Sequence, residues 1–192
     1  MGNKKLKVCE HHGITDDQMK FLWWAIKEMR ARGWKPITYV EIGVFYGGVF
    51  RRVLEQLTED GDFAYGMDLF EQGPEHTKGN THVSGFVDSH VVRDELAKRG
   101  FTNFMLFVGD SAETVPQLPP IRNGLIVIDG NHTFEATKKD FINIYEKMEN
   151  GFIFFHDTDW AGPDRVTREI VQKEYGLPKI KENRGARLYE RR

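Results

Sequence analysis

The sequence predicts an α/β fold in which helices flank a mostly parallel central sheet. Strand-like and helix-like segments alternate from residue 37 onward, which is typical of right-handed β–α–β connections. Residues 125–128 form a continuous apolar run, as expected for a strand buried on both faces of a parallel sheet. A strand, a glycine-bearing turn and a helix follow one another within residues 37–57, and this order is typical of nucleotide-binding α/β units.

The size and composition of the chain narrow the classes of protein to consider. A length of 192 residues suits one domain, and we expect a flexible N-terminal segment at residues 1–13 and a single domain at 14–192. The net charge of −2 gives no overall basic surface for nucleic acid, and the one cysteine, Cys9, fits a reducing compartment. No apolar run approaches the roughly 20 residues of a membrane span, and the first residues lack the apolar core of a signal peptide. We therefore expect a cytoplasmic protein that binds neither nucleic acid nor a membrane.

Most secondary-structure elements can be assigned in order along the chain. Thr15 and Gln18 form a capping-box pattern before an amphipathic helix that ends near Gly33, and its apolar face offers a surface for a homodimer. Asp88 is positioned to cap a helix that ends at Gly100. Further strands are expected at 63–67, 104–108 and 152–155, further helices at 133–148 and about 164–175, and a final hairpin from 179–181 and 186–189. Residues 71–87 are polar and unpatterned, which indicates a mobile lid or substrate-facing loop.

An acidic residue lies at the end of each expected strand before the final hairpin. These residues are Glu41, Asp68, Asp110, Asp129 and Asp157. In doubly wound sheets, ligands bind at the carboxyl ends of the strands. Asp68 follows the glycine turn by about 20 residues, the separation of an acid that accepts hydrogen bonds from ribose hydroxyls. A solvated loop carboxylate is the alternative for Asp68, and an N-cap of the next helix is an alternative for Asp110 or Ser111.

Two segments carry a resemblance to a known family. The order E-I-G-x-x-x-G-G from Glu41 is not the dinucleotide fingerprint G-x-G-x-x-G, and it resembles the first motif of class I S-adenosylmethionine-dependent methyltransferases. The stretches IDGNHTFEATKKDF and GFIFFHDTD are similar to small O-methyltransferases whose signature reads roughly D-G-x-H-x-Y-E, then a strand and H-D. Phe134 stands where that signature has tyrosine. The resemblance covers residues 37 to about 160.

The resemblance implies a Rossmann-like fold, a cofactor and an acceptor class. The expected sheet has seven strands and ends in an antiparallel hairpin. S-adenosylmethionine is the implied methyl donor, and a hydroxyl of a small molecule, of the sugar or natural-product type, is the implied acceptor. The expected cofactor-binding residues are Glu41, Gly43, Gly47, Asp68, Asp110 and Ser111. Specificity would depend on the 71–87 loop and the loop after Trp160.

Asp129 and Asp157 are candidate metal ligands, because the carboxyl groups that end neighbouring strands can converge on one cation. His156 is a candidate third ligand. Oxygen ligands favour Mg²⁺, whereas an imidazole leaves Mn²⁺ or another transition ion open. A cation bound to the acceptor oxygen would lower the pKa of that hydroxyl.

His132, three residues after Asp129, is the candidate general base. The catechol-type relatives carry a catalytic lysine at the matching place, and the ordinary histidine pKa near 6.5 suits proton abstraction. The alternative is that His132 only caps or braces the next helix. Glu135 could orient His132 or complete the metal site.

Two other functions remain open from the sequence. One is a protein of this fold that binds S-adenosylmethionine in an assembly without transferring a methyl group. The other is a methyltransferase for a macromolecule, which the lack of a basic surface and of an N-P-P-Y-like segment disfavours.

Overall fold

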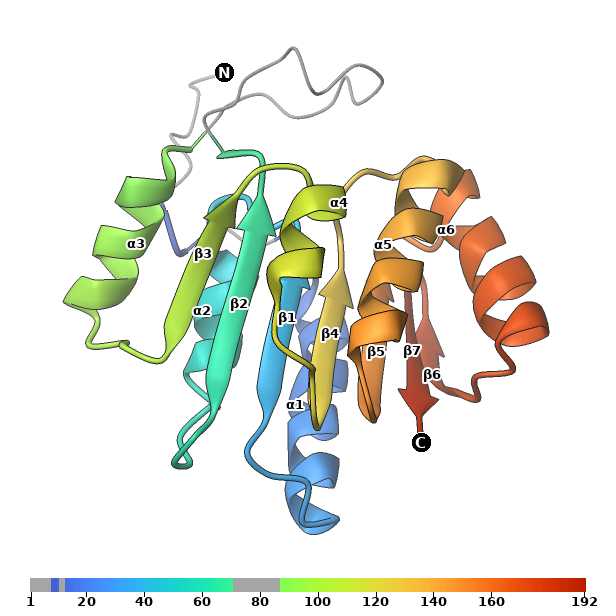
Figure 1. Cartoon of the computed structure of the whole chain (residues 1–192), viewed down its shortest axis with the longest axis horizontal. Coiled ribbons are helices and arrows are strands. Elements are labelled where there is room, and N and C mark those ends of the chain that lie inside the picture. The colour runs from blue at the N-terminus through green and yellow to red at the C-terminus, as the bar shows by residue number, and fades with distance from the viewer. Residues whose placement is uncertain (1–7, 11–12, 71–86) are drawn as a thin grey trace.

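The computed structural model describes residues 8–10, 13–70 and 87–192. A central sheet carries helices on both of its faces (Figure 1). Apart from residue 87, the segment expected to form a lid lies outside the described residues. Within them, no helix combines the length and the apolar character needed to cross a membrane.

The sheet has seven strands in the order β3-β2-β1-β4-β5-β7-β6. The strands are β1 (Thr38–Ile42), β2 (Phe63–Asp68), β3 (Phe104–Val108), β4 (Gly124–Ile128), β5 (Gly151–His156), β6 (Lys179–Asn183) and β7 (Ala186–Arg191). Strands β1 to β5 are parallel, whereas β7 runs antiparallel to both of its neighbours, β5 and β6. The predicted Rossmann-like fold with a C-terminal antiparallel hairpin is therefore confirmed.

The helices begin largely where the sequence provides caps. They are α1 (Asp16–Ala31), α2 (Gly48–Leu54), α3 (Ser89–Lys98), α4 (Ser111–Thr114), α5 (Phe134–Lys147) and α6 (Ala161–Arg165), with the short segments η2 (Val115–Gln117) and η3 (Val166–Glu174). The capping box of α1 is formed, because Gln18 N donates to Thr15 Oγ1 and Thr15 N donates to Gln18 Oε1. Asp88 caps α3 as predicted. The single helix expected at about 164–175 is instead α6 followed by the π-helical turns of η3.

Apolar residues form one core on each face of the sheet. Helices α1, α2 and α3 contribute to the first core, and α5 and η3 contribute to the second. The sequence of β5 is continuously apolar because both faces of the strand are buried. Phe152 and Phe154 face the first core, while Ile153 and Phe155 face the second. All four side chains are fully buried.

Two observations bear on what the sequence led us to expect of the N-terminal region. Cys9, within the segment expected to be flexible, is fully buried; its N–H donates to Tyr46 O, and its carbonyl accepts from Arg51 Nε at 2.6 Å. The apolar face of α1 is not free for a second copy, because Leu22 and Met29 on that face are fully buried in the first core.

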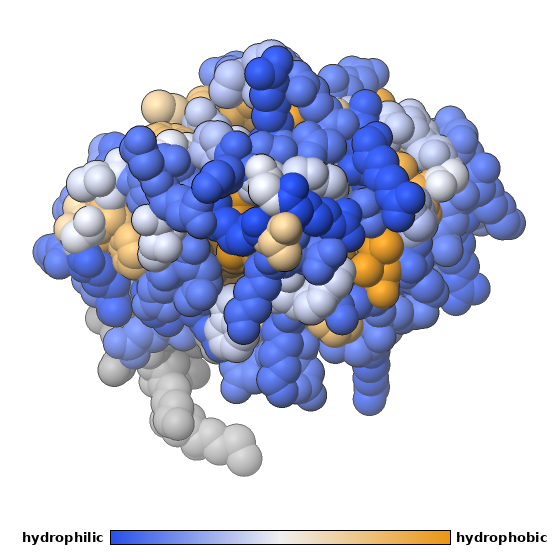
Figure 2. Space-filling view, turned by 90° about the horizontal axis from the view of Figure 1, so that it is seen from below, coloured by the Kyte–Doolittle hydropathy of each residue, from blue (hydrophilic) through white to orange (hydrophobic). Residues whose placement is uncertain are grey.

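Seen from below, at the end of the sheet where β1 to β5 begin, the surface is mainly hydrophilic with separate apolar spots (Figure 2).

Candidate active site

The candidate site lies at the carboxyl ends of β1, β4 and β5, which are adjacent in the sheet. Ile42 at the end of β1 pairs with Ile128 of β4, which in turn pairs with Phe155 of β5. The parallel register therefore brings the residues that follow these strands to one edge. Asp129 leaves β4 there, and its N–H donates to the carbonyl of Ile42 at 2.9 Å.

Two carboxylates and two imidazoles meet at this edge, and we call Asp129, His132, His156 and Asp157 the Asp–His cluster. His156 Nδ1 lies 2.9 Å from Asp129 Oδ1 and 3.4 Å from Asp157 Oδ2. His132 Nε2 lies 2.9 Å from Asp157 Oδ2 and 3.7 Å from Asp129 Oδ1. The structure thus brings together the four candidate metal-binding and catalytic residues that the sequence singled out after β4 and at the end of β5. Glu135 is not among the ion-pair partners of these four residues.

The charges of the Asp–His cluster hold protons on both imidazoles. Burial alone would lower the pKa of His132, but contacts with Asp129 and Asp157 outweigh it and raise that pKa to about 9. The same balance raises the pKa of His156 to about 10. Burial alone would raise the pKa of Asp157, but the two imidazoles hold it well below its usual range. The unperturbed histidine pKa expected from the sequence therefore does not apply to His132 in this arrangement.

The donor atoms of the cluster fit a divalent cation. One ligand atom each from Asp129, His156 and Asp157 lie within 4.8 Å of one another. Two carboxylate oxygens and one imidazole nitrogen form a donor set that suits Mg²⁺, Mn²⁺ or a related ion. His132 adds a polar atom without a partner, because its buried Nδ1 has no hydrogen-bond partner among the described residues.

The loop that carries His132 is held by the first turn of α6. A Cβ added at Gly162 would lie 2.1 Å from the His132 carbonyl oxygen, so only glycine allows the two backbones to approach this closely. The Trp160 ring lies against the His132 ring, with centroids 4.9 Å apart, and Arg165 lies over the Phe134 ring. The first turn of α6 and its N-cap Trp160 therefore fix the position of His132.

The glycine turn after β1 directly contacts the Asp–His cluster. Gly43 has a φ of +94°, and a Cβ there would lie 2.1 Å from the Asp129 carbonyl oxygen. Gly47 is the N-cap of α2. The turn expected to approach a nucleotide-like ligand is thus packed against the residue that begins the cluster.

Two acidic residues surround this turn. Glu41 is buried and accepts a hydrogen bond from the Tyr39 hydroxyl. Burial, together with the charges of Asp129 and Asp68, raises the pKa of Glu41 well above its usual value. Asp68 accepts hydrogen bonds from the backbone N–H groups of Phe45 at 2.7 Å and Phe70 at 3.0 Å. Asp68 is therefore not a merely solvated loop residue, because it braces the glycine turn.

The turn after β3 places Asp110 and Ser111 at the same edge of the sheet. Asp110 is the N-cap of α4 and accepts from Ala112 N at 2.7 Å, as one of the sequence interpretations expects. The Ser111 hydroxyl donates to the buried carboxyl group of Asp140 on α5. Burial raises the pKa of Asp140 to about 7, although the bond from Ser111 opposes this rise.

Sequence reasoning missed Tyr39, Asp140 and Gly162. The spacing of Tyr39 and Glu41 was an available signal, because residues two apart share one face of a strand. Asp140 and Gly162 gave no local signal. Their contacts join elements that are adjacent only in the folded chain.

Comparisons with known proteins agree with this geometry. Residues 40–158 match the family described as "Methyltransferase domain". The structure of the O-methyltransferase NovP is 18% identical, over 94% of this chain and 82% of its own, with a TM-score of 0.73. An O-methyltransferase from Bacillus cereus in complex with S-adenosylhomocysteine is 12% identical, over 94% of this chain and 84% of its own, with a TM-score of 0.60.

The fold is also found in a protein described as a decarboxylase. Precorrin 8W decarboxylase of Methanobacterium thermoautotrophicum is 16% identical, over 97% of this chain and 96% of its own, with a TM-score of 0.59. A search of curated proteins found no match. Structural likeness at these identities shows a common fold, whereas the family match extends over well over half of the chain. The chain therefore belongs to the methyltransferase-domain family and is an S-adenosylmethionine-dependent methyltransferase.

Proposed function

We propose that the protein is an O-methyltransferase that moves a methyl group from S-adenosylmethionine to a hydroxyl of a small molecule with the help of a divalent cation. The observation that carries the proposal is the Asp–His cluster built directly against the glycine turn. The contact between Gly43 and the Asp129 backbone puts the expected donor side and acceptor side next to each other. Methyl transfer needs adjacent donor and acceptor sites, because it is an in-line displacement between two bound partners.

The donor side is assigned to residues around the glycine turn and the next two strand ends. Gly43 and Gly47 have φ angles of +94° and +77°, which only glycine adopts without strain, and they shape the turn on which the donor is proposed to bind. Asp68 is fixed by two backbone N–H groups, and each of its oxygens keeps a lone pair for a ribose hydroxyl. Glu41, whose buried carboxyl group accepts from the Tyr39 hydroxyl, is assigned to the same side, and Asp110 and Ser111 are assigned to the adenine end.

The acceptor side is assigned to the Asp–His cluster. Asp129, His156 and Asp157 are the proposed ligands of the cation, and His132 is the proposed base that takes the hydroxyl proton. A bound Mg²⁺ or similar ion would lower the pKa of the acceptor hydroxyl and take up the negative charge that otherwise keeps His132 protonated. His132 and the ligands come from adjacent strand ends, so one hydroxyl can reach all of them.

Calorimetry on the purified protein tests both halves of the proposal. S-adenosylhomocysteine should bind to the protein, and absence of binding would refute the proposed function. Mg²⁺ or Mn²⁺ should bind to the native protein but not to Asp129→Asn or Asp157→Asn, while Asp94→Asn on the exposed face of α3 serves as the matched control. Undiminished metal binding by both cluster variants would refute the cation site. Binding of S-adenosylhomocysteine with no metal effect on turnover would favour a non-catalytic or metal-independent role.

A further inference from the structure

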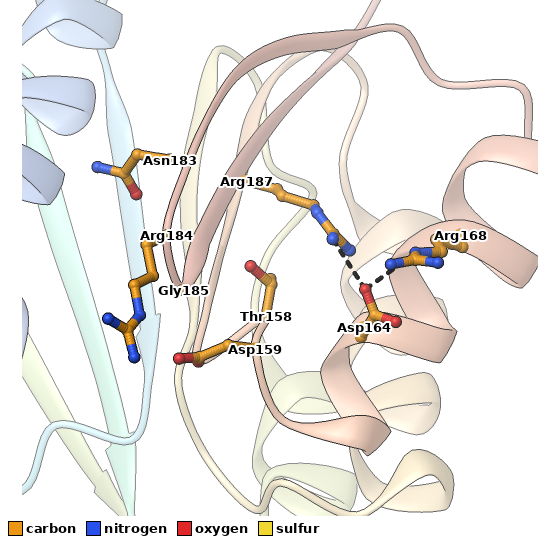
Figure 3. Close-up of a pocket in the computed structure, with 8 residues that line it drawn as sticks. All are labelled: Thr158, Asp159, Asp164, Arg168, Asn183, Arg184, Gly185 and Arg187. Atoms are coloured by element: carbon orange, nitrogen blue, oxygen red, sulfur yellow. Dashed lines mark ion pairs between the residues drawn. The ribbon is translucent and has the colours of Figure 1, made fainter.

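A cavity of about 340 Å³ lies between the β6–β7 turn and the first turns of α6 and η3. Its wall includes Thr158 and Asp159 on one segment, Arg184 on the turn, and Asp164 and Arg168 on the helical side (Figure 3). None of these residues belongs to the Asp–His cluster or to the expected donor site. The lining has three arginines and two aspartates, so it carries an excess of one positive charge.

The strand register puts this cavity at the catalytic edge of the sheet. His156 at the end of β5 pairs with Ala186 at the start of the antiparallel β7, so the β6–β7 turn lies where β5 ends. The N–H of Thr158 donates to the carbonyl of Gly185 at 3.1 Å and joins the turn to the segment after Asp157. Asp159 follows Asp157 by two residues, and two Cα steps span at most about 7 Å. The cavity therefore begins next to the Asp–His cluster.

One arginine of the cavity has a structural role. The Nε of Arg187 donates to Glu182 Oε1, and its Nη1 donates to Thr167 Oγ1. Its Nη2 lies 2.8 Å from Asp164 Oδ1. Arg187 is buried, and each of its guanidinium nitrogens already has a partner. It holds the hairpin to the start of η3 and is not free to bind a ligand.

Arg168 and Arg184 differ from Arg187. Only the Nε of Arg168 contacts Asp164, at 3.0 Å, and the side chain is 62% exposed, so its two Nη groups remain available. Arg184 forms no ion pair with any other residue in the described part of the chain, and its backbone is fixed because its carbonyl accepts from Gln18 Nε2 at 3.1 Å. Figure 3 shows Arg184 and Arg168 on opposite sides of the cavity. Guanidinium forks on a fixed backbone favour carboxylate and phosphate oxygens.

We propose that this cavity is an anion subsite for the methyl acceptor, in which Arg184 and Arg168 bind a carboxylate or phosphate group that the acceptor carries besides its hydroxyls. This inference rests on the methyltransferase function proposed above. Asp159, on the same wall, accepts hydrogen bonds from hydroxyl groups near the anion. The acceptor is thus an acidic, hydroxylated small molecule whose charged end occupies the cavity while one hydroxyl reaches the Asp–His cluster.

Nuclear magnetic resonance of the arginine Nε–H groups tests the subsite without knowledge of the acceptor. Inorganic phosphate and acetate are titrated separately into the full chain at constant ionic strength with chloride, so that the two arms separate phosphate from carboxylate recognition. The signals of Arg184 and Arg168, assigned from Arg184→Gln and Arg168→Gln, should shift and saturate. The control is the exposed Arg122, which precedes β4 at the end of the sheet where the parallel strands begin. Its signal should not respond. Equal, unsaturated responses of all three arginines would show ordinary solvated side chains and overturn the proposal.

The variants give the second criterion. Loss of one charge-assisted contact should weaken anion binding at the remaining arginine about tenfold. Unchanged affinity in Arg184→Gln would overturn its role. When the protein is loaded with paramagnetic Mn²⁺, the carboxyl ¹³C signal of acetate bound in the cavity should broaden more than it does with Arg184→Gln. Equal broadening with both proteins would show that the cavity is too far from the cation to hold part of the acceptor. Binding of S-adenosylhomocysteine should be the same in all variants. If the native protein binds S-adenosylhomocysteine but shows no saturable anion response, the subsite alone is overturned, whereas no cofactor binding by the native protein would overturn the proposed function.

Discussion

His132 faces both carboxylates of the Asp–His cluster from the loop between β4 and α5. We predict that His132→Ala lowers kcat by about a hundredfold or more, because a positioned base contributes roughly that much. Affinity for S-adenosylhomocysteine should be retained, since the donor is assigned to the glycine turn and Asp68, whereas His132 faces Asp129 and Asp157. Steady-state kinetics and calorimetry on the same preparations check this.

The exposed His90 on α3 provides the control for that variant. His90→Ala should keep native kcat and native cofactor affinity. If His132→Ala weakens cofactor binding and stability while kcat changes little, then His132 is a brace for α5 and not the base.

Asp140 gives the protein a pH-dependent stability that can be separated from the Asp–His cluster. Its pKa is raised from 3.8 to about 7, first by burial and then by the nearby charge of Asp110, against the effects of Ser111 and Lys139. The folded state therefore binds this proton more tightly than the unfolded chain. The stabilisation is fully present below the unfolded value of 3.8 and is lost as the pH rises through about 7.

We predict that Asp140→Asn removes this dependence while its amide oxygen keeps the bond from Ser111. Between roughly pH 4 and 7, the unfolding free energy of the native protein should fall relative to the variant by about 1.4 kcal/mol per pH unit. Urea unfolding of both proteins across this pH range measures the difference between their unfolding free energies. The contributions of all other titratable groups cancel in that difference. Parallel curves would contradict a raised pKa at Asp140.

At the scale of elements, the sequence predicts most strands and caps because their signals are local. The apolar run of β4, the capping box of Thr15 and the strand-end acids depend on residues only a few positions apart. The meeting of Asp129 with Asp157 could also be predicted, because parallel neighbours end at one edge. The buried face of α1, the contact of Asp140 with Ser111 and the anion cavity could not, since each depends on how separate elements pack.

Gly162 joins two such elements, and we predict that Gly162→Ala both destabilises the protein and slows turnover. The added Cβ would collide with the backbone of residues 132–134 and push α6 away from the His132 loop. Overpacking of this kind costs about 1 to 3 kcal/mol of unfolding free energy. Gly13→Ala is the control, because a Cβ there meets nothing within 4 Å. Equal unfolding midpoints and equal kcat for the two variants would show that the loop adjusts without consequence.

At the scale of the molecule, the order of the strands explains why donor and acceptor sites adjoin. The chain moves outward from β1 through β2 to β3, then returns to β4 on the other side of β1. The turns after β1 and β4 thus lead away from each other at the point where the strand order reverses, which is where doubly wound sheets bind ligands. Gly43 and Asp129 are the first residues after these two strands, and they are in contact.

This junction predicts that Gly43→Ala impairs both halves of the site at once. A Cβ would lie 2.1 Å from the Asp129 carbonyl oxygen, and the φ of +94° strains any L side chain. Relieving the clash must move the glycine turn, Asp129 or both, so the affinities for S-adenosylhomocysteine and for Mg²⁺ should both fall. A strain of roughly 1.4 kcal/mol at each site corresponds to a loss of affinity of about tenfold. Asp129→Asn, in contrast, should weaken only the cation, because it leaves the backbone contact intact. Calorimetry with each ligand compares the two variants, and a Gly43→Ala protein that lost cofactor affinity alone would show that the two halves of the site are mechanically independent.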